Sequence, residues 1–374
     1  REKLFNRTGL GFYTDLDVNG DEALDAQDCI DGGGFLACHF ENSFDQIKTS
    51  YAAYTDLSYE MTEKIILRGG LRYTHDRGAL KNFISQMSGP DGELIANLIP
   101  GSTTDLFATT SARFRKSNMS GKVGVDFKPN RDTLVYVTAS RGYRGNSFNA
   151  QAFFVPDELS ITKPETIDAL EIGAKGQLFD RRVQLSGAVF AYNYKNQQYL
   201  SNDPDTGVQR LGNLPKTRIY GAELEVTARP VDNLRLTAGL GLLHTRVRKG
   251  MLQGENLKGK RLPTAPPVSL SAAADWTVPL GDAGSLLVHV DGSHAASQHS
   301  YLLNQPFLRR RALTLLNSRV GYRTPDEKTE IAVWMKNITN EYYFNSRLDA
   351  SGLGFIYNHI GDPRTYGVTL TRNF

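Results

Sequence analysis

The chain ends in the stretch GDPRTYGVTLTRNF, Gly361 to Phe374, whose alternating pattern indicates a β-strand and is interpreted together with the rest of the chain. After a Gly-Asp-Pro turn, Tyr366, Val368 and Leu370 alternate with small or polar residues up to the terminal phenylalanine. Successive side chains of a strand point to opposite faces, so this segment has one apolar and one small, polar face. Such a strand covers the core of a soluble sheet, or stands in an outer-membrane barrel between lipid and a polar lumen.

About 14 segments of the chain match the period-two strand pattern. Short turns lie near residues 60, 130, 180, 230, 282 and 326. Long loops lie near residues 15–43, 80–106, 146–162, 200–213, 248–263, 298–309 and 343–362. Short connections on one side and long ones on the other are typical of an all-β, transmembrane antiparallel β-barrel, whereas a β-sandwich does not sort its loops in this way.

The composition of the 374 residues agrees with this class. The chain has 35 Gly, 17 Tyr and 18 Phe, and no apolar run approaches the ~18 residues of a membrane helix. A mean hydropathy of −0.38 suits a barrel, because half of each strand faces water. The net charge of +3 gives no argument for nucleic acid as a partner. The start at Arg1, without Met or signal peptide, indicates a fragment or a processed chain.

Several segments of the sequence resemble those of one family, the TonB-dependent receptors. In the family's order these are KIILRGGLRYTHD (64–76), SGKVGVDFKPNRDTLVYVTASRGYRGNSFN (120–149), PETIDALEIGAKGQLFDRRVQLSGAVF (164–190), IYGAELEVTARP (219–230), RLPTAPP (261–267), WMKNITNEYY (334–343) and the closing stretch. The resemblance implies a barrel of about 22 strands with a plugged lumen. Residues 1–374 are therefore interpreted as the C-terminal part of such a barrel, with about eight strands and the plug domain outside this chain.

The same resemblance implies a function and partners. A receptor of this family lies in the outer membrane of a Gram-negative bacterium as a multi-pass barrel and imports a bulky, scarce ligand, here first of all a ferric siderophore. Energy is expected from the TonB-ExbB-ExbD complex, through the missing N-terminal part. Outer-membrane lipid, lipopolysaccharide and, through the C-terminal strand, the barrel assembly machinery are further expected partners of a monomer. Nickel chelates, cobalamin and saccharides are alternative cargoes.

Two other functions stay open from the residues alone. One is a passive porin of 14 strands, which a plug domain upstream would exclude. The other is a surface adhesin whose first long loop is the binding element. An outer-membrane enzyme is not supported, because the chain has neither HExxH nor GxSxG. The segment Gly254–Lys260 resembles a phosphate-binding loop, but Arg261 stands where Ser or Thr is needed. No catalytic residue and no catalytic cofactor is therefore predicted.

The first long loop, residues 15–43, carries a candidate calcium site. It resembles the twelve-residue calcium loop of EF-hand and dockerin modules, in which oxygen ligands at alternating positions are closed by a carboxylate at position 12. Glu22 stands where glycine usually makes the sharp turn, and the closing residue is Asp rather than Glu. The competing interpretation is a solvated acidic loop. The candidate ligands are Asp17, Asn19, Asp21 and Asp28.

The only two cysteines, Cys29 and Cys38, lie in the same loop directly after the last candidate ligand. A close pair in a loop suits an oxidising compartment. The sequence therefore predicts a disulfide that braces the loop, with two reduced thiols as the alternative.

Candidate ligand-binding residues lie at the expected extracellular strand ends. Arginines and aromatic rings that face the lumen could receive an anionic, aromatic ligand such as a ferric siderophore. The alternatives are arginines paired with lumen carboxylates such as Glu171, and aromatic residues in an interfacial girdle. The run Arg309–Arg311 could attract an anionic substrate or lipopolysaccharide, or be a solvated loop end. The candidates are Arg141, Arg144, Phe148, Tyr343, Phe355, Tyr357 and His359.

Overall fold

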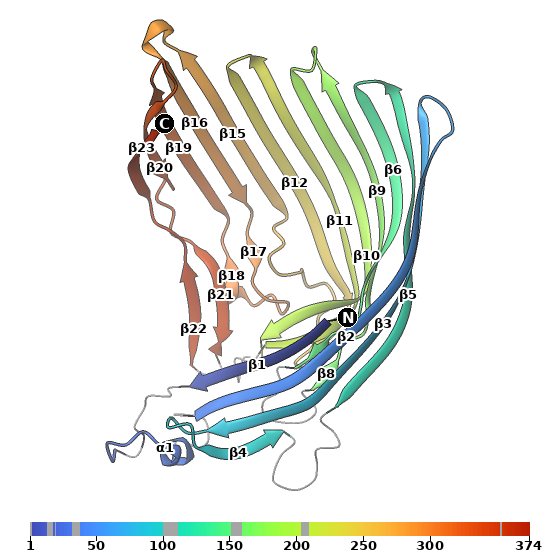
Figure 1. Cartoon of the computed structure of the whole chain (residues 1–374), viewed down its shortest axis with the longest axis vertical. Helices are drawn as coiled ribbons and strands as arrows, with labels where there is room; N and C mark the ends of the chain where they lie inside the picture. Colours follow the sequence, from blue (N-terminus) through green and yellow to red (C-terminus); the bar gives the residue numbers. More distant parts are fainter. Residues whose placement is uncertain are drawn as a thin grey trace.

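A computed structural model describes residues 2–12, 18, 20–31, 38–99, 111–150, 159–202, 209–351 and 354–374. Its main feature is one curved antiparallel sheet whose strands follow one another in sequence order (Figure 1). The path is β1-β2-β3-β5-β6-β9-β10-β11-β12-β15-β16-β19-β20-β23, and β4 pairs with β3 off this path in the 15-stranded sheet. The expected all-β antiparallel fold with about 14 strands is therefore confirmed.

The elements have the following bounds. The first part consists of β1 (Glu2–Phe12), α1 (Ala26–Asp31), β2 (Cys38–Glu60), β3 (Ile65–Ser88), β4 (Leu94–Ile99), β5 (Ala112–Asn130), β6 (Thr133–Arg144), β7 (Phe148–Asn149), β8 (Ser160–Ile161), β9 (Glu165–Leu178), β10 (Val183–Asn202) and β11 (Gln209–Val231). The second consists of β12 (Leu234–Lys249), β13 (Met251–Leu252), β14 (Glu255–Asn256), β15 (Val268–Pro279), β16 (Ser285–Ala295), β17 (Gln298–His299), η4 (Pro306–Leu308), β18 (Arg309–Arg310), β19 (Leu313–Arg323), β20 (Thr329–Lys336), β21 (Phe344–Ala350), β22 (Phe355–Ile360) and β23 (Thr365–Arg372).

The connections are sorted by length between the two ends of the sheet. Short turns such as the one between β9 and β10 lie at one end, the upper end in Figure 1. The other end carries α1 and the two-stranded hairpins β7–β8, β13–β14, β17–β18 and β21–β22. Among the described residues, β1 and β23 are the two ends of the path and do not pair with each other. The sheet is therefore an open wall.

The two faces of the sheet differ in polarity. One row of register partners crosses β6, β9, β10, β11 and β12 and is entirely apolar. The opposite face carries paired polar groups, such as the Tyr136 hydroxyl, which donates to Glu171 at 2.7 Å, and the Arg68–Asp126 ion pair at 2.7 Å. The apolar row is Val137, Ile172, Val189, Ala222 and Leu242. Among the residues that the structure describes, no helix is long and apolar enough to cross a membrane.

The strands extend further into the expected loops than their sequence suggests. β2 begins at Cys38, inside the expected loop 15–43, and β3 continues to Ser88, inside the expected loop 80–106. The reason is packing: Phe44, Leu80 and Phe83 are buried together at this end, with the Phe44 and Phe83 rings stacked at 5.8 Å. Burial of these side chains stabilises the pairing of β2 with β3 in the region expected to be a loop.

β20 ends at Lys336, at the start of a turn that leads toward the final strand. Asn337 has a φ of 48°, a left-handed conformation that interrupts a strand. Its buried side chain holds the turn that follows: Glu341 N–H donates to Oδ1 at 2.9 Å, and Nδ2 donates to the Asp362 carbonyl at 3.1 Å. Asn337 thereby ties this turn to the segment that enters the final strand.

Candidate ligand-binding site

An arginine-lined cavity lies at the end of the sheet that carries the long loops. It measures about 450 Å³ and opens between the β17–β18 hairpin, the start of β19 and the segment that leads into β21. Glu341 is the one carboxylate among its described lining residues. Such a concentration of positive charge, in a space of the size that small ligands occupy, suits an anionic ligand. The four guanidinium groups belong to Arg309, Arg310, Arg311 and Arg347.

Arg309 and Arg310 are held by neutral groups. Arg309 Nη2 donates to Ser297 Oγ at 2.5 Å, and Arg310 Nη1 donates to the Asn345 carbonyl at 2.6 Å. Arg310 Nε is buried without a hydrogen-bond partner among the described residues. Burial lowers the pKa of the Arg310 guanidinium from its ordinary value. A buried charged donor without an acceptor is costly, so an anion entering the cavity would be stabilised at this point.

Arg347, on β21 of the β21–β22 hairpin, is also held by hydrogen bonds to neutral acceptors. Its Nε donates to Asn358 Oδ1 at 2.7 Å, and its Nη1 donates to the Phe307 carbonyl at 2.5 Å. The guanidinium also lies 5.0 Å from the centre of the Phe344 ring. A planar guanidinium held by fixed neighbours is suited to bind an anionic oxygen ligand, and its fork geometry matches the two oxygens of a carboxylate. The charge of Arg347 therefore stays available to a ligand.

The pKa of His299, which lies near this cavity, is affected by the surrounding positive charges. Its pKa is lowered first by burial and then by the neighbouring cations Arg309, Arg261 and Lys260. Its Nδ1 is buried without a hydrogen-bond partner in the described part of the chain. The imidazole is therefore held neutral beside a group of cations.

A second cavity of about 250 Å³ lies on the other side of Arg310 and Arg347, which line both spaces. Its lining combines apolar side chains with Gln305, whose Nε2 donates to Asp349 Oδ2 at 3.3 Å. The backbone N–H of Asp349 donates to the Tyr301 hydroxyl at 3.3 Å. The two arginines thus form a wall between a cationic space and a more apolar one.

Tyr343 is the one predicted ligand-binding residue that the structure places in the arginine-lined cavity. The cavity reaches Tyr343 because Gly361 lets the ring approach the backbone: a Cβ built at Gly361 would lie 2.1 Å from the ring. The Gly361 N–H also donates to the Tyr343 carbonyl at 2.9 Å. Gly361, the first residue of the closing stretch, thus positions this side chain.

Arg141 does not face the lumen as expected. It lies on the same face of β6 as Val137 and Ala139, the apolar face, because strand side chains alternate. Its Nε donates to Asp168 on β9 at 2.6 Å, and Arg141 is not paired with Glu171. The expectation that Arg141 contacts a ligand in the lumen is therefore corrected.

Arg144 and Phe148 are also separated from the arginine-lined cavity. Arg144 lines a different cavity of about 590 Å³, which it shares with Lys48 and Asp76. Phe148 is 8% exposed and packs in the cluster around Phe44, with its ring 5.2 Å from that of Phe114. Phe148 is therefore a packing residue of the loop region, and its assignment as a ligand contact is corrected.

Phe355, Tyr357 and His359 alternate along β22 and share one exposed face of that strand. Asn358, which accepts the hydrogen bond from Arg347, lies on the opposite face. The three side chains therefore point away from the cavity that Arg347 lines. The described lining of the cavity contains none of them.

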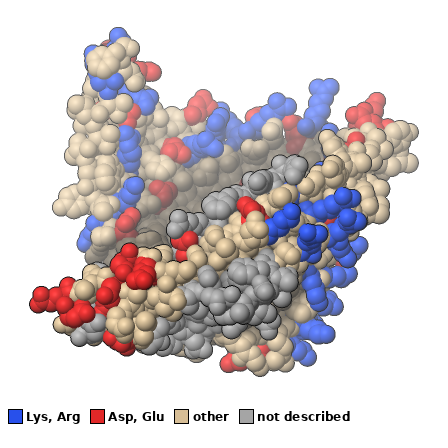
Figure 2. Space-filling view, turned by 60° about the horizontal axis from the view of Figure 1, so that its bottom comes forward, with Lys and Arg blue, Asp and Glu red and all other residues tan. Residues whose placement is uncertain are grey.

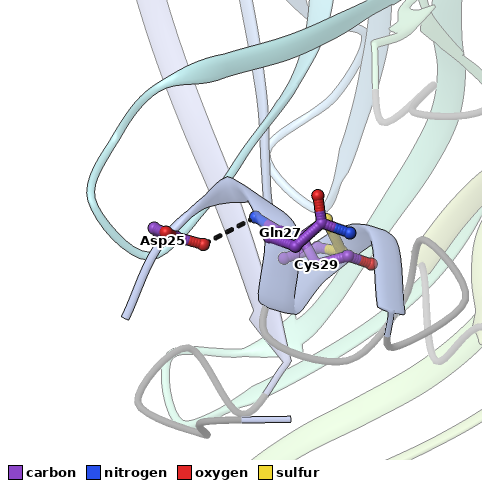
Figure 3. Close-up of a disulfide and its surroundings, with 4 residues drawn as sticks. Asp25, Gln27 and Cys29 are labelled. Carbon is purple, nitrogen blue, oxygen red and sulfur yellow. Dashed lines mark hydrogen bonds between the residues drawn. A yellow bond between two sulfur atoms is a disulfide. The ribbon is translucent and has the colours of Figure 1, made fainter. Parts of the chain in front are cut away.

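The first long loop contains the disulfide and part of the candidate calcium site. Cys29 in α1 and Cys38 at the start of β2 are joined by a disulfide, with a Cα–Cα distance of 4.8 Å (Figure 3). Asp25 Oδ1 accepts the Gln27 N–H at 2.8 Å (Figure 3). Asp28 Oδ2 accepts the Asp25 N–H at 3.1 Å. These reciprocal bonds cap the start of α1.

The calcium ligands are only partly described. Asp17 and Asn19 lie outside the described residues. Asp28 is fully buried, and its Oδ1 accepts the Val18 N–H at 2.6 Å. In the described part of the chain, no group of three or more His, Cys, Asp or Glu side chains is arranged to hold a metal ion. The calcium site stays a prediction.

The sequence of the chain is similar to those of known outer-membrane receptors. The family model described as TonB dependent receptor-like, beta-barrel matches residues 4–338. The pesticin receptor of Yersinia enterocolitica is 22% identical over 295 residues, which cover 78% of this chain and 39% of that protein. A probable TonB-dependent receptor of Bordetella pertussis is 32% identical over 150 residues, 39% of this chain and 19% of that protein.

Solved structures show the same fold. The ferric yersiniabactin uptake receptor of Yersinia pestis superposes with a TM-score of 0.71 at 18% identity, over 90% of this chain and 47% of that one. The siderophore receptor PiuA of Acinetobacter baumannii superposes with a TM-score of 0.63 at 16% identity, over 89% of this chain and 44% of that one. The chain thus spans less than half the length of these relatives. It belongs to the TonB-dependent receptors and forms part of their β-barrel in the outer membrane.

Proposed function

We propose that the receptor containing this chain binds a ferric siderophore at the arginine-lined cavity and imports it across the outer membrane. The observation that carries the proposal is the set of four arginines around a space of about 450 Å³, three of which, Arg309, Arg310 and Arg347, donate to neutral acceptors rather than to carboxylates. Ferric siderophores present negatively charged oxygen atoms, often on aromatic rings. Guanidinium groups beside Tyr343 and Phe344 match both features.

The names of the relatives support this cargo. The matched Yersinia pestis structure is a ferric yersiniabactin uptake receptor, and the matched Pseudomonas sp. sequence is a ferric-pyoverdine receptor. Both are named for a ferric chelate. The family is one of receptors and transporters, and we assign no catalytic role to the chain.

The proposed partners follow from the family. Energy for import comes from the TonB-ExbB-ExbD complex, which engages a part of the receptor outside this chain. The barrel assembly machinery receives the protein through β23, and the receptor acts as a monomer in contact with outer-membrane lipid and lipopolysaccharide. Removal of the coupling complex is expected to abolish import while leaving ligand binding at the cell surface intact.

Binding of a panel of ferric siderophores to the whole purified receptor tests the cargo. Arg310→Gln removes a buried, charge-assisted donor and is expected to weaken the bound member by about 10- to 100-fold. Arg131→Gln removes one exposed charge at the opposite end of the sheet and should leave the affinity unchanged. The proposal fails if no panel member binds, or if both variants bind like the unaltered receptor.

A further inference from the structure

The second cavity, of about 250 Å³, shares Arg310 and Arg347 with the arginine-lined cavity. A ligand bound at these two guanidinium groups therefore has both spaces within reach. Both cavities lie at the end of the sheet that carries the long loops, and Figure 2 shows that end with a hollow enclosed by the wall. If the arginines take the anionic part of a cargo, the chemistry of the second cavity decides which groups can be attached to that part.

One wall of the second cavity is the surface of a small hydrophobic core. Leu302 lines the cavity, is 3% exposed and is buried together with Leu214 and Val247 in this core. Leu252 and Leu303 also line the cavity and pack against the same core. The apolar wall is therefore formed before a ligand enters, as is usual for small-molecule sites.

Reciprocal hydrogen bonds hold the segment that carries Leu302 and Leu303. The Arg261 N–H donates to Asn304 Oδ1 at 2.7 Å, and Asn304 Nδ2 donates to the Arg261 carbonyl at 3.0 Å. Lys260 Nζ donates to the Leu303 carbonyl at 2.7 Å. A cavity with fixed walls keeps its size, so it can discriminate between ligands by the group that enters it.

The carboxylate of the second cavity is used within the protein. Asp349 is the one carboxylate among the described lining residues, and it is 5% exposed. Its Oδ2 accepts from Gln305 Nε2 at 3.3 Å, and its Oδ1 accepts the Ser351 N–H at 3.1 Å. A cationic group of a ligand would lose its hydration here without gaining this carboxylate as a free partner. An uncharged group is better suited to the space.

Leu200, near the end of β10, presents uncovered apolar surface at the second cavity. It lines the cavity and is nevertheless 60% exposed. An apolar ligand group that covers this side chain removes hydrocarbon surface from water on both partners, which is favourable. A cavity of about 150 Å³ is enough for a benzene ring, so the volume of about 250 Å³ accepts one ring or a short alkyl chain.

We propose that the second cavity makes the receptor selective for ferric chelates that carry an uncharged apolar ring or short alkyl arm beside their iron-binding oxygen atoms. The oxygen atoms lie at Arg310 and Arg347, and the arm enters the second cavity against Leu200, Leu252 and Leu302. Leu200 is then a specificity-determining residue. This inference rests on the function proposed above and adds to it the class of cargo that the site prefers.

A series of synthetic ferric chelates tests the inference on the whole purified receptor. Ferric tris-catecholates carry a single alkyl arm that grows from methyl to octyl, and ferric tris-hydroxamates form a parallel series. Each methylene group that moves from water into an apolar space strengthens binding about fourfold. The affinity, measured by isothermal titration, should therefore rise with arm length and stop rising once the arm fills the cavity.

Leu200→Gln and Leu94→Gln are matched variants for this series. Both replace an exposed leucine, and Leu94, on β4, is outside the described lining of the cavity. Leu200→Gln should weaken the hexyl-armed chelate by about tenfold and leave the methyl-armed one unchanged, because only the longer arm reaches the side chain. Leu94→Gln should change neither affinity. Heat-modifiable migration checks that both variants are folded.

The outcomes separate this inference from the proposed function. An affinity that is independent of arm length, or equal effects of the two leucine variants, would overturn the selectivity and leave the arginine-lined site in place. Binding of no member of either series would overturn both. Arg310→Gln should weaken the methyl-armed chelate, which Leu200→Gln leaves unchanged, so the contributions of the two cavities are measured independently.

Discussion

The indole ring of Trp334 on β20 lies against the backbone of Gly367, its register partner on β23. A Cβ built at Gly367 would lie 2.5 Å from Cζ2 of the ring, a distance that no real contact allows. The indole N–H donates to Thr369 Oγ1 at 3.2 Å, so the ring stays across the final strand. The small residue in the closing stretch therefore serves the packing of the neighbouring strand.

Gly367→Ala should destabilise the pairing of β20 with β23. The added methyl group must displace the indole, which costs about 1–3 kcal/mol for overpacking of this kind. Denaturant unfolding of the receptor, followed by heat-modifiable migration, measures the effect. Gly292→Ala is the matched control, because a Cβ there would lie an ordinary 3.5 Å from Leu316 Cδ1. Equal stability of the two variants would show that the indole moves aside without cost.

Much of the wall could be predicted from the sequence because its signals are local. Period-two alternation and turn residues lie within one segment, so the strands from β2 to β23 appear near their expected places. The orientation of Arg141 was also available, since it follows Val137 and Ala139 at the strand period and so shares their face.

The candidate site was less accessible to sequence analysis because it depends on contacts between distant segments. Arg310 and Arg347 line one cavity only because the β17–β18 and β21–β22 hairpins meet, and no local pattern indicates this. The run Arg309–Arg311 was a partial signal. Phe148 looked like an exposed aromatic residue until its partners Phe44 and Leu80 were placed around it.

Loss of the disulfide should loosen the first loop without affecting the wall. Cys29 and Cys38 are nine residues apart, and closing a loop of this length stabilises it by about 2–3 kcal/mol in the chain-entropy account. In the variant Cys29→Ser/Cys38→Ser, amide exchange of α1 should become faster, while β10 to β12 keep their protection. Uniformly faster exchange across the sheet would contradict this local role.

Calcium binding by the first loop is testable with two neighbouring carboxylates, of which only one stands at a predicted ligand position. Asp21 stands at a predicted ligand position, whereas Glu22 occupies position 6, with a φ of 67° where glycine is usual. Asp21→Asn should weaken calcium binding by on the order of tenfold, and Glu22→Gln, which removes the same charge, should not. Isothermal titration of the receptor with Ca²⁺ measures both. Undetectable binding, or equal weakening by the two changes, would favour a solvated acidic loop.

Acidification should destabilise the loops around the arginine-lined cavity through His299. Burial and the cations beside it lower the pKa of His299 below its ordinary value of 6.5. Between that lowered pKa and about 6.5, the unfolded segment binds more protons than the folded one, so stability is complete above about pH 6.5 and falls as the pH drops. Amide exchange of residues 297–312, corrected for intrinsic rates, should therefore accelerate at lower pH. His299→Gln should remove this acceleration, and His359→Gln, at an exposed position on β22, should preserve it. Acceleration that persists in His299→Gln would assign the pH response to another group.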